Sequence, residues 1–436
     1  MMPLRAGFGR FLWLWLPSIV VFIFGLRRAF LTGQTDPWDW ILPMAVVLVV
    51  IGLLIARRGW TMLVWVALGS SGMALIFCAL AAGRVPDGLA AAGVLAVASL
   101  ASFGGAFLRC FPFGPRLVGR AVPDASRLRS KRAEAGVGLL LLIFAALICW
   151  RGPAHPIRMS PDRPALAVIT ALPLFWDEAG QGGPRDAPIV TLLRTRFTVM
   201  PMDDPLRLAS SGVKRLLLAQ PRAMSPAQRV AIDQWVRNGG TVLVLDDPLL
   251  RWTSDLPLGD RRRAPSVGLL HPLLAHWGFR PHSVWEKENR THLPGGHVIT
   301  LSGTQLFVTG PEGRIAGADE SFVHRKRLGS GEMLLLGDAD PIDDRLWLAD
   351  PAHPLDPRLW IADTPAQLVH WLGGAPVPGD RRWMQAAQDV QGGIRWAVLA
   401  GIIWAMMGAG LLRPERRGFG PGTKGEDDGI KYNKSG

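Results

Sequence analysis

Cysteine is scarce in this chain and is confined to its apolar parts. The 436 residues include three cysteines, Cys78, Cys110 and Cys149, each in or beside a long apolar segment. The polar stretch from Gly152 to Gly392 contains none. We therefore expect no disulfide bond, no thiolate zinc site and no catalytic thiol in that stretch.

Two signatures of nucleotide and metal chemistry are also missing. The sequence has no Gly-x-x-x-x-Gly-Lys-Ser/Thr, so the chain is not itself the ATPase of a transporter. It has no His-Glu-x-x-His, and His271, His276, His282, His292 and His297 are scattered. We accordingly predict neither a zinc site nor a cofactor.

Acidic residues are few outside the polar stretch. Gly152 to Gly392 holds 26 basic and 26 acidic residues, whereas the rest of the chain holds 22 basic against 9 acidic ones. The whole net charge of +13 therefore flanks apolar segments. This placement indicates membrane orientation rather than nucleic-acid binding.

Long apolar runs fill the remainder of the chain. Five of them predict N-terminal transmembrane helices at about residues 11–31, 39–56, 60–82, 88–108 and 135–150, and Ile394 to Leu412 predicts a sixth. The fourth run is rich in Ala, Gly and Ser, which suits close contact between helices in lipid. The predicted plan is a five-helix membrane domain (1–151), a soluble domain (152–380), a C-terminal membrane helix (381–413) and a disordered cytoplasmic tail (414–436).

Basic residues predict which way these helices run. The connection between the fourth and fifth runs carries Arg109, Arg116, Arg120, Arg127, Arg129, Lys131 and Arg132. The positive-inside rule places this loop, and hence the N-terminus, in the cytoplasm. The polar domain then lies outside, and the tail with Arg413, Arg416, Arg417 and Lys424 returns to the cytoplasm. Arg27 and Arg28, on an outward connection, depart from this pattern. We predict a multi-pass protein of the bacterial inner membrane with a periplasmic soluble domain.

The soluble domain is organised around Ser225 to Pro248. Ser225 and Gln228 form a capping-box pattern with Pro226 at the first helical position, and Asn238-Gly239-Gly240 ends the helix. The apolar run Thr241 to Leu245 follows and predicts a strand buried on both faces.

The same alternation of helix and strand extends along the polar stretch. Strands are predicted at Ala165–Thr170, Phe197–Met200, Val213–Gln220 and Glu332–Leu336, and helices at Pro188–Arg194, Leu269–Trp277 and from Thr364, where the capping pattern recurs. His297 to Val308, with Gly303 inside it, predicts a hairpin at the edge of the sheet. The fold class is α/β, with a mostly parallel sheet between helices.

Acidic residues follow three of these strands. Asp177 and Glu178 follow the first, Asp246 and Asp247 follow Leu245, and Asp338 and Asp340 follow Leu336. The carboxyl edge of such a sheet is where α/β proteins carry their sites, so these six residues are the candidate ligand- or partner-binding surface. Asp338, Asp340, Asp343 and Asp344 could bind Mg²⁺ or Ca²⁺, or Asp338 and Asp340 could cap the turn after the strand.

Tryptophans are frequent in the predicted loops of this domain. Buried packing is the simplest interpretation of Trp176, Trp252, Trp285, Trp347 and Trp360, and a partner-binding surface is the alternative.

Three stretches carry a family resemblance. They are SPAQRVAIDQWVRNGGTVLVLDDP, GSGEMLLLGDADPIDDRLW and QLVHWLGG. Together they resemble the extracytoplasmic domain of the gliding-motility-type auxiliary proteins of ABC transporters, over roughly Leu166 to Gly374. The resemblance implies a flavodoxin-like fold similar to class I glutamine amidotransferases, and partners among ABC permeases, ABC ATPases or other envelope proteins.

The enzymes of that fold attack an amide with a cysteine thiolate, and no cysteine lies in this domain. We therefore predict a non-catalytic accessory or scaffold subunit with no catalytic residue. A membrane-anchored, metal-dependent hydrolase and an envelope sensor that signals through Arg116 to Arg132 are the alternatives.

Overall fold

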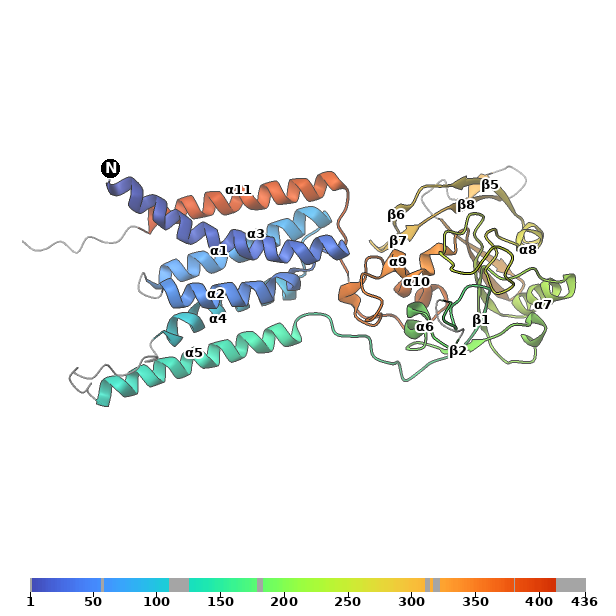
Figure 1. Ribbon diagram of the computed structural model, residues 1–436, viewed down its shortest axis with the longest axis horizontal. Coiled ribbons are helices and arrows are strands. Elements are labelled where there is room, and N and C mark those ends of the chain that lie inside the picture. Colours follow the sequence, from blue (N-terminus) through green and yellow to red (C-terminus); the bar gives the residue numbers. More distant parts are fainter. Residues whose placement is uncertain are drawn as a thin grey trace, which may run out of the picture.

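The computed structural model describes residues 2–55, 59–109, 125–178, 183–309, 314–316, 322–379 and 381–412. They form a bundle of long helices and an α/β domain that lie end to end along the molecule (Figure 1). Cys110, Arg116, Arg120 and the tail from Arg413 lie outside the described residues.

The bundle contains the apolar runs predicted from the sequence. Its helices are α1 (Met2–Thr32), α2 (Ile41–Ile55), α3 (Trp60–Ala82), α4 (Gly88–Leu108), α5 (Ala125–Arg151) and α11 (Ala387–Leu411), and the 3₁₀ turn η1 (Pro37–Trp40) precedes α2. Within the described ranges, six helices are long and apolar enough to cross a membrane. The structure thus confirms long apolar helices at the N-terminus and one near the C-terminus, while the number that cross the bilayer stays a prediction.

Small residues bring α2 and α4 close together. A Cβ on Gly105 would lie 2.3 Å from the carbonyl oxygen of Val49, and one on Gly52 would lie 2.3 Å from that of Ser102. Close backbone approach of this kind is how helices associate where water provides no driving force. The Ala, Gly and Ser content of the fourth run therefore has the packing role expected of it.

The C-terminal helix returns to the N-terminal bundle. Trp404 of α11 stacks on Trp65 of α3 with ring centroids 4.2 Å apart. Each indole Nε1 donates to the other residue's backbone oxygen, at 2.9 Å from Trp65 and 2.8 Å from Trp404. Helices more than 300 residues apart in the chain are therefore tied directly together.

The α/β domain is built on a six-stranded sheet with the order β10-β11-β4-β3-β1-β2. Five strands are parallel, and β10 pairs antiparallel with β11. The strands are β1 (Ala165–Thr170), β2 (Thr198–Pro201), β3 (Arg215–Ala219), β4 (Thr241–Leu245), β10 (Val323–Leu328) and β11 (Gly331–Leu336). This confirms the predicted α/β sheet, with the predicted strands β1 and β4 at their full bounds.

Helices cover both faces of the sheet because the strands are apolar on both. Leu217, Leu243 and Leu334 pack with α6 (Pro188–Leu193) and α10 (Thr364–Trp371). Leu216 and Val242 pack on the opposite face with α7 (Pro226–Arg237) and α8 (His271–His276). Alternate residues of each strand thus enter separate cores, as period-2 geometry requires.

The two predicted capping boxes have different outcomes. At α7 the Ser225 side chain accepts from the Gln228 backbone N–H, and the Gln228 side chain accepts from that of Ser225. The helix α10 begins at Thr364 as predicted, but its N-cap is Asp363, without a side-chain cap hydrogen bond, so the predicted capping box was wrong. The Asp363 carboxylate instead accepts from Arg381 and from Trp383 Nε1.

The predicted hairpin at His297 to Val308 was also wrong. These residues form β7 (Val298–Leu301), which pairs with β6 (Asn289–His292), and β8 (Thr304–Thr309), which pairs with β5 (Phe279–Trp285) and β9 (Arg314–Ala316). Gly303 has φ +81 and turns the chain against the backbone of Leu249. Because that turn packs on another loop, β7 and β8 join separate small sheets rather than each other.

The two chain segments between the bundle and the α/β domain pair with each other, and Gln34 in the first of them contacts the domain. The segment after α1 pairs with the segment before α11, through Thr35 N to Arg382 O at 2.8 Å and Met384 N to Gly33 O at 2.9 Å. Buried Gln34 donates its Nε2 to the carbonyl oxygens of Pro357 and Trp360.

The remaining short elements are η3 (Pro205–Arg207), η4 (Asp340–Ile342), α9 (Asp344–Trp347) and η5 (Pro357–Leu359).

Candidate functional site

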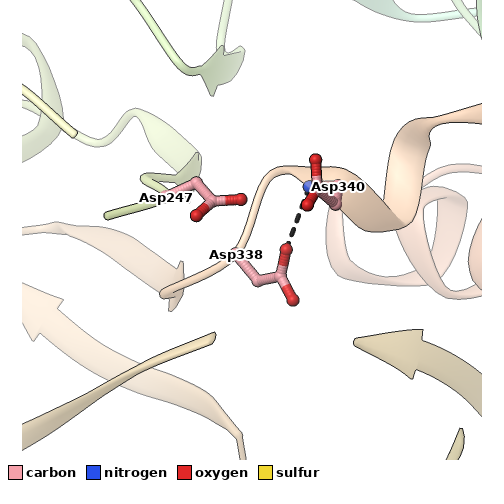
Figure 2. Close-up of side chains that lie close together, drawn as sticks. All are labelled: Asp247, Asp338 and Asp340. Atoms are coloured by element: carbon pink, nitrogen blue, oxygen red, sulfur yellow. Dashed lines mark hydrogen bonds between the residues drawn. The ribbon is translucent and has the colours of Figure 1, made fainter. Parts of the chain in front are cut away.

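The six acidic residues predicted as one surface lie in three places at the carboxyl edge of the sheet. Asp247, Asp338 and Asp340 form one buried cluster, in which each residue places a carboxylate oxygen within 4.8 Å of the others. We call this cluster the acidic triad (Figure 2). Asp246 faces a separate small cavity, and Asp177 and Glu178 line a cleft.

Backbone N–H groups hold all three carboxylates of the triad. Asp247 accepts from Leu249 N at 2.7 Å and from Ala339 N at 3.3 Å. Asp338 accepts from Asp340 N at 2.9 Å, the contact drawn in Figure 2. The triad therefore fastens the loops after β4 and β11 to each other.

Further hydrogen bonds connect the triad to two neighbouring segments. Asp338 Oδ2 accepts from Ser302 N and from Thr304 Oγ1, at the turn between β7 and β8. Both oxygens of Asp340 lie within 3.1 Å of Arg251 N. The structure thus confirms the turn-capping interpretation for Asp338, whose Oδ1 accepts from Asp340 N, whereas the Asp340 carboxylate binds the loop after β4 instead.

Burial and mutual repulsion raise the pKa values of the triad. Burial raises the pKa of Asp247 to about 6, against the opposing effect of its backbone hydrogen bonds. Burial and the charge of Asp247 raise the pKa of Asp340 to about 7, and the same two causes raise that of Asp338. Near neutral pH the cluster therefore retains protons that exposed aspartates have lost.

Two chemical states can relieve the repulsion within the triad. A shared proton gives a carboxylic acid to carboxylate hydrogen bond, and a hard divalent cation would bind one oxygen from each residue. Asp343 and Asp344, the other two residues considered for a cation, are not in this cluster. Asp343 caps α9, where its Oδ1 accepts from Arg345 N at 3.0 Å.

Asp246 points away from the triad. Its carboxylate accepts from the backbone of Leu270 and Leu269, and burial raises its pKa to about 6. The residue lines a cavity of about 230 Å³ with Gly268 and His271, and its Oδ1 has no hydrogen-bond partner among the described residues. The two adjacent aspartates after β4 therefore lie in different environments, Asp247 in the triad and Asp246 in a separate cavity.

A larger cavity lies at the same edge of the sheet. It measures about 570 Å³. Its acidic lining residues are Asp177, Glu178, Asp186, Asp255 and Asp344, and Trp176, Trp252 and Arg185 also contribute. We call it the acidic cleft. Its walls come from the loops after β1, β4 and β11, so the carboxyl ends of three parallel strands supply it.

Internal contacts fix the walls of the acidic cleft. Glu178 accepts from Ser254 Oγ at 2.8 Å and from Asp255 N at 3.2 Å, and Asp177 pairs with Arg185 at 3.1 Å. Among the tryptophans of the predicted loops, Trp347 and Trp360 are fully buried, in line with packing. Trp176 and Trp252 are half-buried in the cleft, where they remain candidates for partner contact.

One residue of this edge was not singled out from the sequence. Gln220 follows β3 with φ +42, and it is the only non-glycine residue of the described chain in the left-handed region. Its Nε2 donates to the oxygens of Asp247 and Pro265, and its Oε1 accepts from Asp247 N. Glutamine before proline carries no signal for such a conformation, so the sequence offered no way to find it.

Part of this domain matches a known family. Residues 163–293 match the model of a family described as an ABC-type uncharacterized transport system. The match lies within the α/β domain and supports an accessory role in an ABC transport system. A comparison with curated proteins finds no match.

Solved structures show only weak likenesses. Gan42B, a GH42 beta-galactosidase from G. stearothermophilus, has 17% identity and a TM-score of 0.28 over 65% of this chain and 41% of its own. The exo-beta-1,4-mannosidase Op5Man5 from Opitutaceae bacterium strain TAV5 has 14% identity and a TM-score of 0.25, over 58% of this chain and 43% of its own. The chain thus spans less than half the length of either, and likenesses of this strength support no conclusion about fold or activity.

Proposed function

We propose that this protein is a non-catalytic accessory subunit of an ABC transport complex in a bacterial inner membrane, of the gliding-motility type. The observation that carries the proposal is the family match at residues 163–293 in a chain that also holds six long apolar helices. The helices pack beside a permease, and the α/β domain, similar in fold to a class I glutamine amidotransferase, binds a partner outside the cytoplasm.

The distribution of charge along the bundle supports the periplasmic placement of the domain. The N-terminus lies at the end of the bundle remote from the α/β domain (Figure 1). Arg109 lies at the end of α4, beside the end of α2, where it donates to the backbone oxygens of Leu53 and Leu54. Basic residues favour the cytoplasmic face, so the opposite end of the bundle and the domain attached to it face outward.

The helix α5 supports contact with a partner or with lipid. Only 17% of the residues in its apolar stretch are buried, a smaller share than in the other four N-terminal helices. Its exposed large apolar residues are Val137, Leu139, Leu140, Ile143, Phe144, Leu147 and Trp150. A permease helix packed here would cover a surface that the bundle leaves open.

The conformation of Gln220 supports the absence of catalysis. A sharp strand-to-helix turn is where enzymes of related architecture hold a nucleophile under strain. In this chain that position, between β3 and α7, carries a fully buried glutamine whose side chain joins two loops. An amide is not a nucleophile, and this one has no exposed atom to offer a substrate.

The acidic cleft supports the choice of binding surface. Five carboxylates line it together with two tryptophans, and this combination suits a basic, partly apolar segment of a partner protein. Asp255 is exposed at its rim, so a substitution there changes the charge of the cleft without disturbing the core.

Copurification tests the proposal. The tagged full-length chain, extracted from its native membranes in mild detergent, should bring down an ABC permease and its ATPase, identified by mass spectrometry. Asp255→Lys should weaken retention of a partner bound in the cleft by about 1 kcal/mol, and Asp203→Lys, an exposed site outside the cleft, should not. Recovery of neither ABC subunit above an untagged control would contradict the accessory role.

The acidic triad favours a second candidate, a metal-dependent hydrolase. Its three oxygens within 4.8 Å could hold Mg²⁺ or Mn²⁺. Titration of the purified chain with each ion, followed by thermal unfolding, tests the metal site that the hydrolase requires. A rise in melting temperature that Asp338→Asn abolishes would show that the triad binds the ion, and no rise at millimolar ion would exclude this metal site and with it the hydrolase.

A further inference from the structure

A second cavity lies between the helical bundle and the α/β domain. It measures about 310 Å³ and is lined by residues from both parts, among them Gln34, Asp36, Asp87, Arg358 and Arg381. The candidate membrane spans end at Thr32 and Arg151 and begin at Pro37 and Gly88. The cavity therefore lies where the spans emerge, at the depth of phospholipid headgroups.

Arg381 supplies an unsatisfied cationic donor to this cavity. Its Nε donates to Asp363, and its guanidinium lies 4.7 Å from the centre of the Trp360 ring. Its Nη1 is buried and has no hydrogen-bond partner among the described residues, in a side chain only 6% exposed. A Cβ on Gly379, which also lines the cavity, would lie 3.6 Å from that nitrogen. It is costly to leave a buried charged donor unpaired. An anionic oxygen of a bound ligand would therefore provide the acceptor that Arg381 Nη1 does not find among the described residues.

Carboxylates on the bundle side give the cavity the opposite charge as well. Asp36 accepts from Trp38 N and Asp87 accepts from Ala90 N, each at 3.0 Å. These bonds hold two acceptors on the bundle side of the cavity, and Arg358, Arg381 and Arg382 line its other side. A bound group must therefore present an anion to the domain side and a cation to the bundle side.

We propose that this cavity binds the headgroup of a phospholipid that carries a primary ammonium, with the phosphate at Arg381 and the ammonium at Asp36 and Asp87. A phosphoethanolamine headgroup has both charges in a small volume, as a cavity of about 310 Å³ near the lower limit for ligand sites requires. The lipid then joins the two parts of the protein at the surface of the membrane.

Lipid retention tests this site on the full-length chain in detergent. Native mass spectrometry would compare phosphatidylethanolamine, phosphatidylglycerol and phosphatidylcholine, and thermal unfolding would report stabilisation. We expect phosphatidylethanolamine to be retained at least tenfold more strongly than the other two. Arg381→Gln should weaken retention of all three lipids, because each carries the phosphate, and Asp87→Asn should remove the preference for phosphatidylethanolamine. Ala154→Trp, which fills the cavity without touching an ion pair, should remove retention.

Controls separate the site from general lipid binding. Ala209→Trp places the same ring at an exposed position of the α/β domain and should retain the lipid. Equal retention of phosphatidylglycerol, or unchanged retention by a folded Ala154→Trp variant, would overturn the proposal. Equal stabilisation by free O-phosphoethanolamine would show that the cavity binds the free headgroup rather than a membrane lipid, and would overturn the proposal.

Discussion

The acidic triad places three carboxyl groups where their charges depend on pH. The folded-state pKa values of Asp247 and Asp340 are raised to about 6 and about 7, above those of unfolded aspartate. The folded protein therefore binds protons more tightly than the unfolded chain. The stability that these protons contribute is full below about pH 4 and is lost as the pH rises through about 6 to 7.

We predict that Asp340→Asn raises stability at pH 8 by about 1 to 2 kcal/mol and has little effect at pH 5, because the amide replaces a buried charge with a neutral group. Thermal unfolding of the purified chain between pH 5 and 8 measures this. Asp203→Asn, at an exposed position, is the matched control and should leave the pH profile unchanged. A similar loss of stability at both pH values would show that Asp340 acts only through its hydrogen bonds.

The sequence predicted the neighbourhood of these residues but not their grouping. Acidic residues after apolar strands were expected at one edge, and that is where they lie. Asp246 and Asp247 nevertheless diverge, since successive side chains near a strand end point to opposite faces. Asp363 illustrates the same limit, because its partners Arg381 and Trp383 come from a distant segment and no local pattern announces them.

At the scale of elements, close glycine contacts set the spacing of α2 and α4. We predict that Gly105→Ala lowers the free energy of unfolding by about 1 to 3 kcal/mol, because the added Cβ would meet the backbone oxygen of Val49 at 2.3 Å. Gly72→Ala on α3 is the control, since its Cβ would meet nothing within 4 Å. Thermal unfolding in detergent compares the two, and equal behaviour would mean that α2 and α4 do not need their close approach.

Elements with a strong apolar period were predictable, and the others were not. The buried strands β1 and β4 and the helix α7 have patterns that few alternatives fit. The strands β5 and β6 read FRPHSVW and NRTH, and exposed polar residues of this kind do not predict a strand. Their pairing partners β8 and β7 were therefore assigned to one hairpin that does not exist.

At the scale of the whole molecule, the two parts are joined closely. Two backbone hydrogen bonds join the segment after α1 to the segment before α11, and the Gln34 side chain connects them to the α/β domain. A movement of the domain is therefore transmitted to two helices of the bundle rather than absorbed by a loose linker. The sequence predicted the anchoring helices but not this junction, because its contacts join residues more than 300 positions apart.

The side of the membrane on which the α/β domain lies is the central claim. It is tested by labelling single cysteines in a chain without Cys78, Cys110 and Cys149, with a membrane-impermeant maleimide on intact spheroplasts. Leu258→Cys lies in the domain at a position 88% exposed, and Trp60→Cys lies at the opposite end of the bundle at a position 69% exposed. We predict labelling of Leu258→Cys in intact spheroplasts and of Trp60→Cys only after permeabilisation. The reverse result would place the domain in the cytoplasm and contradict this account.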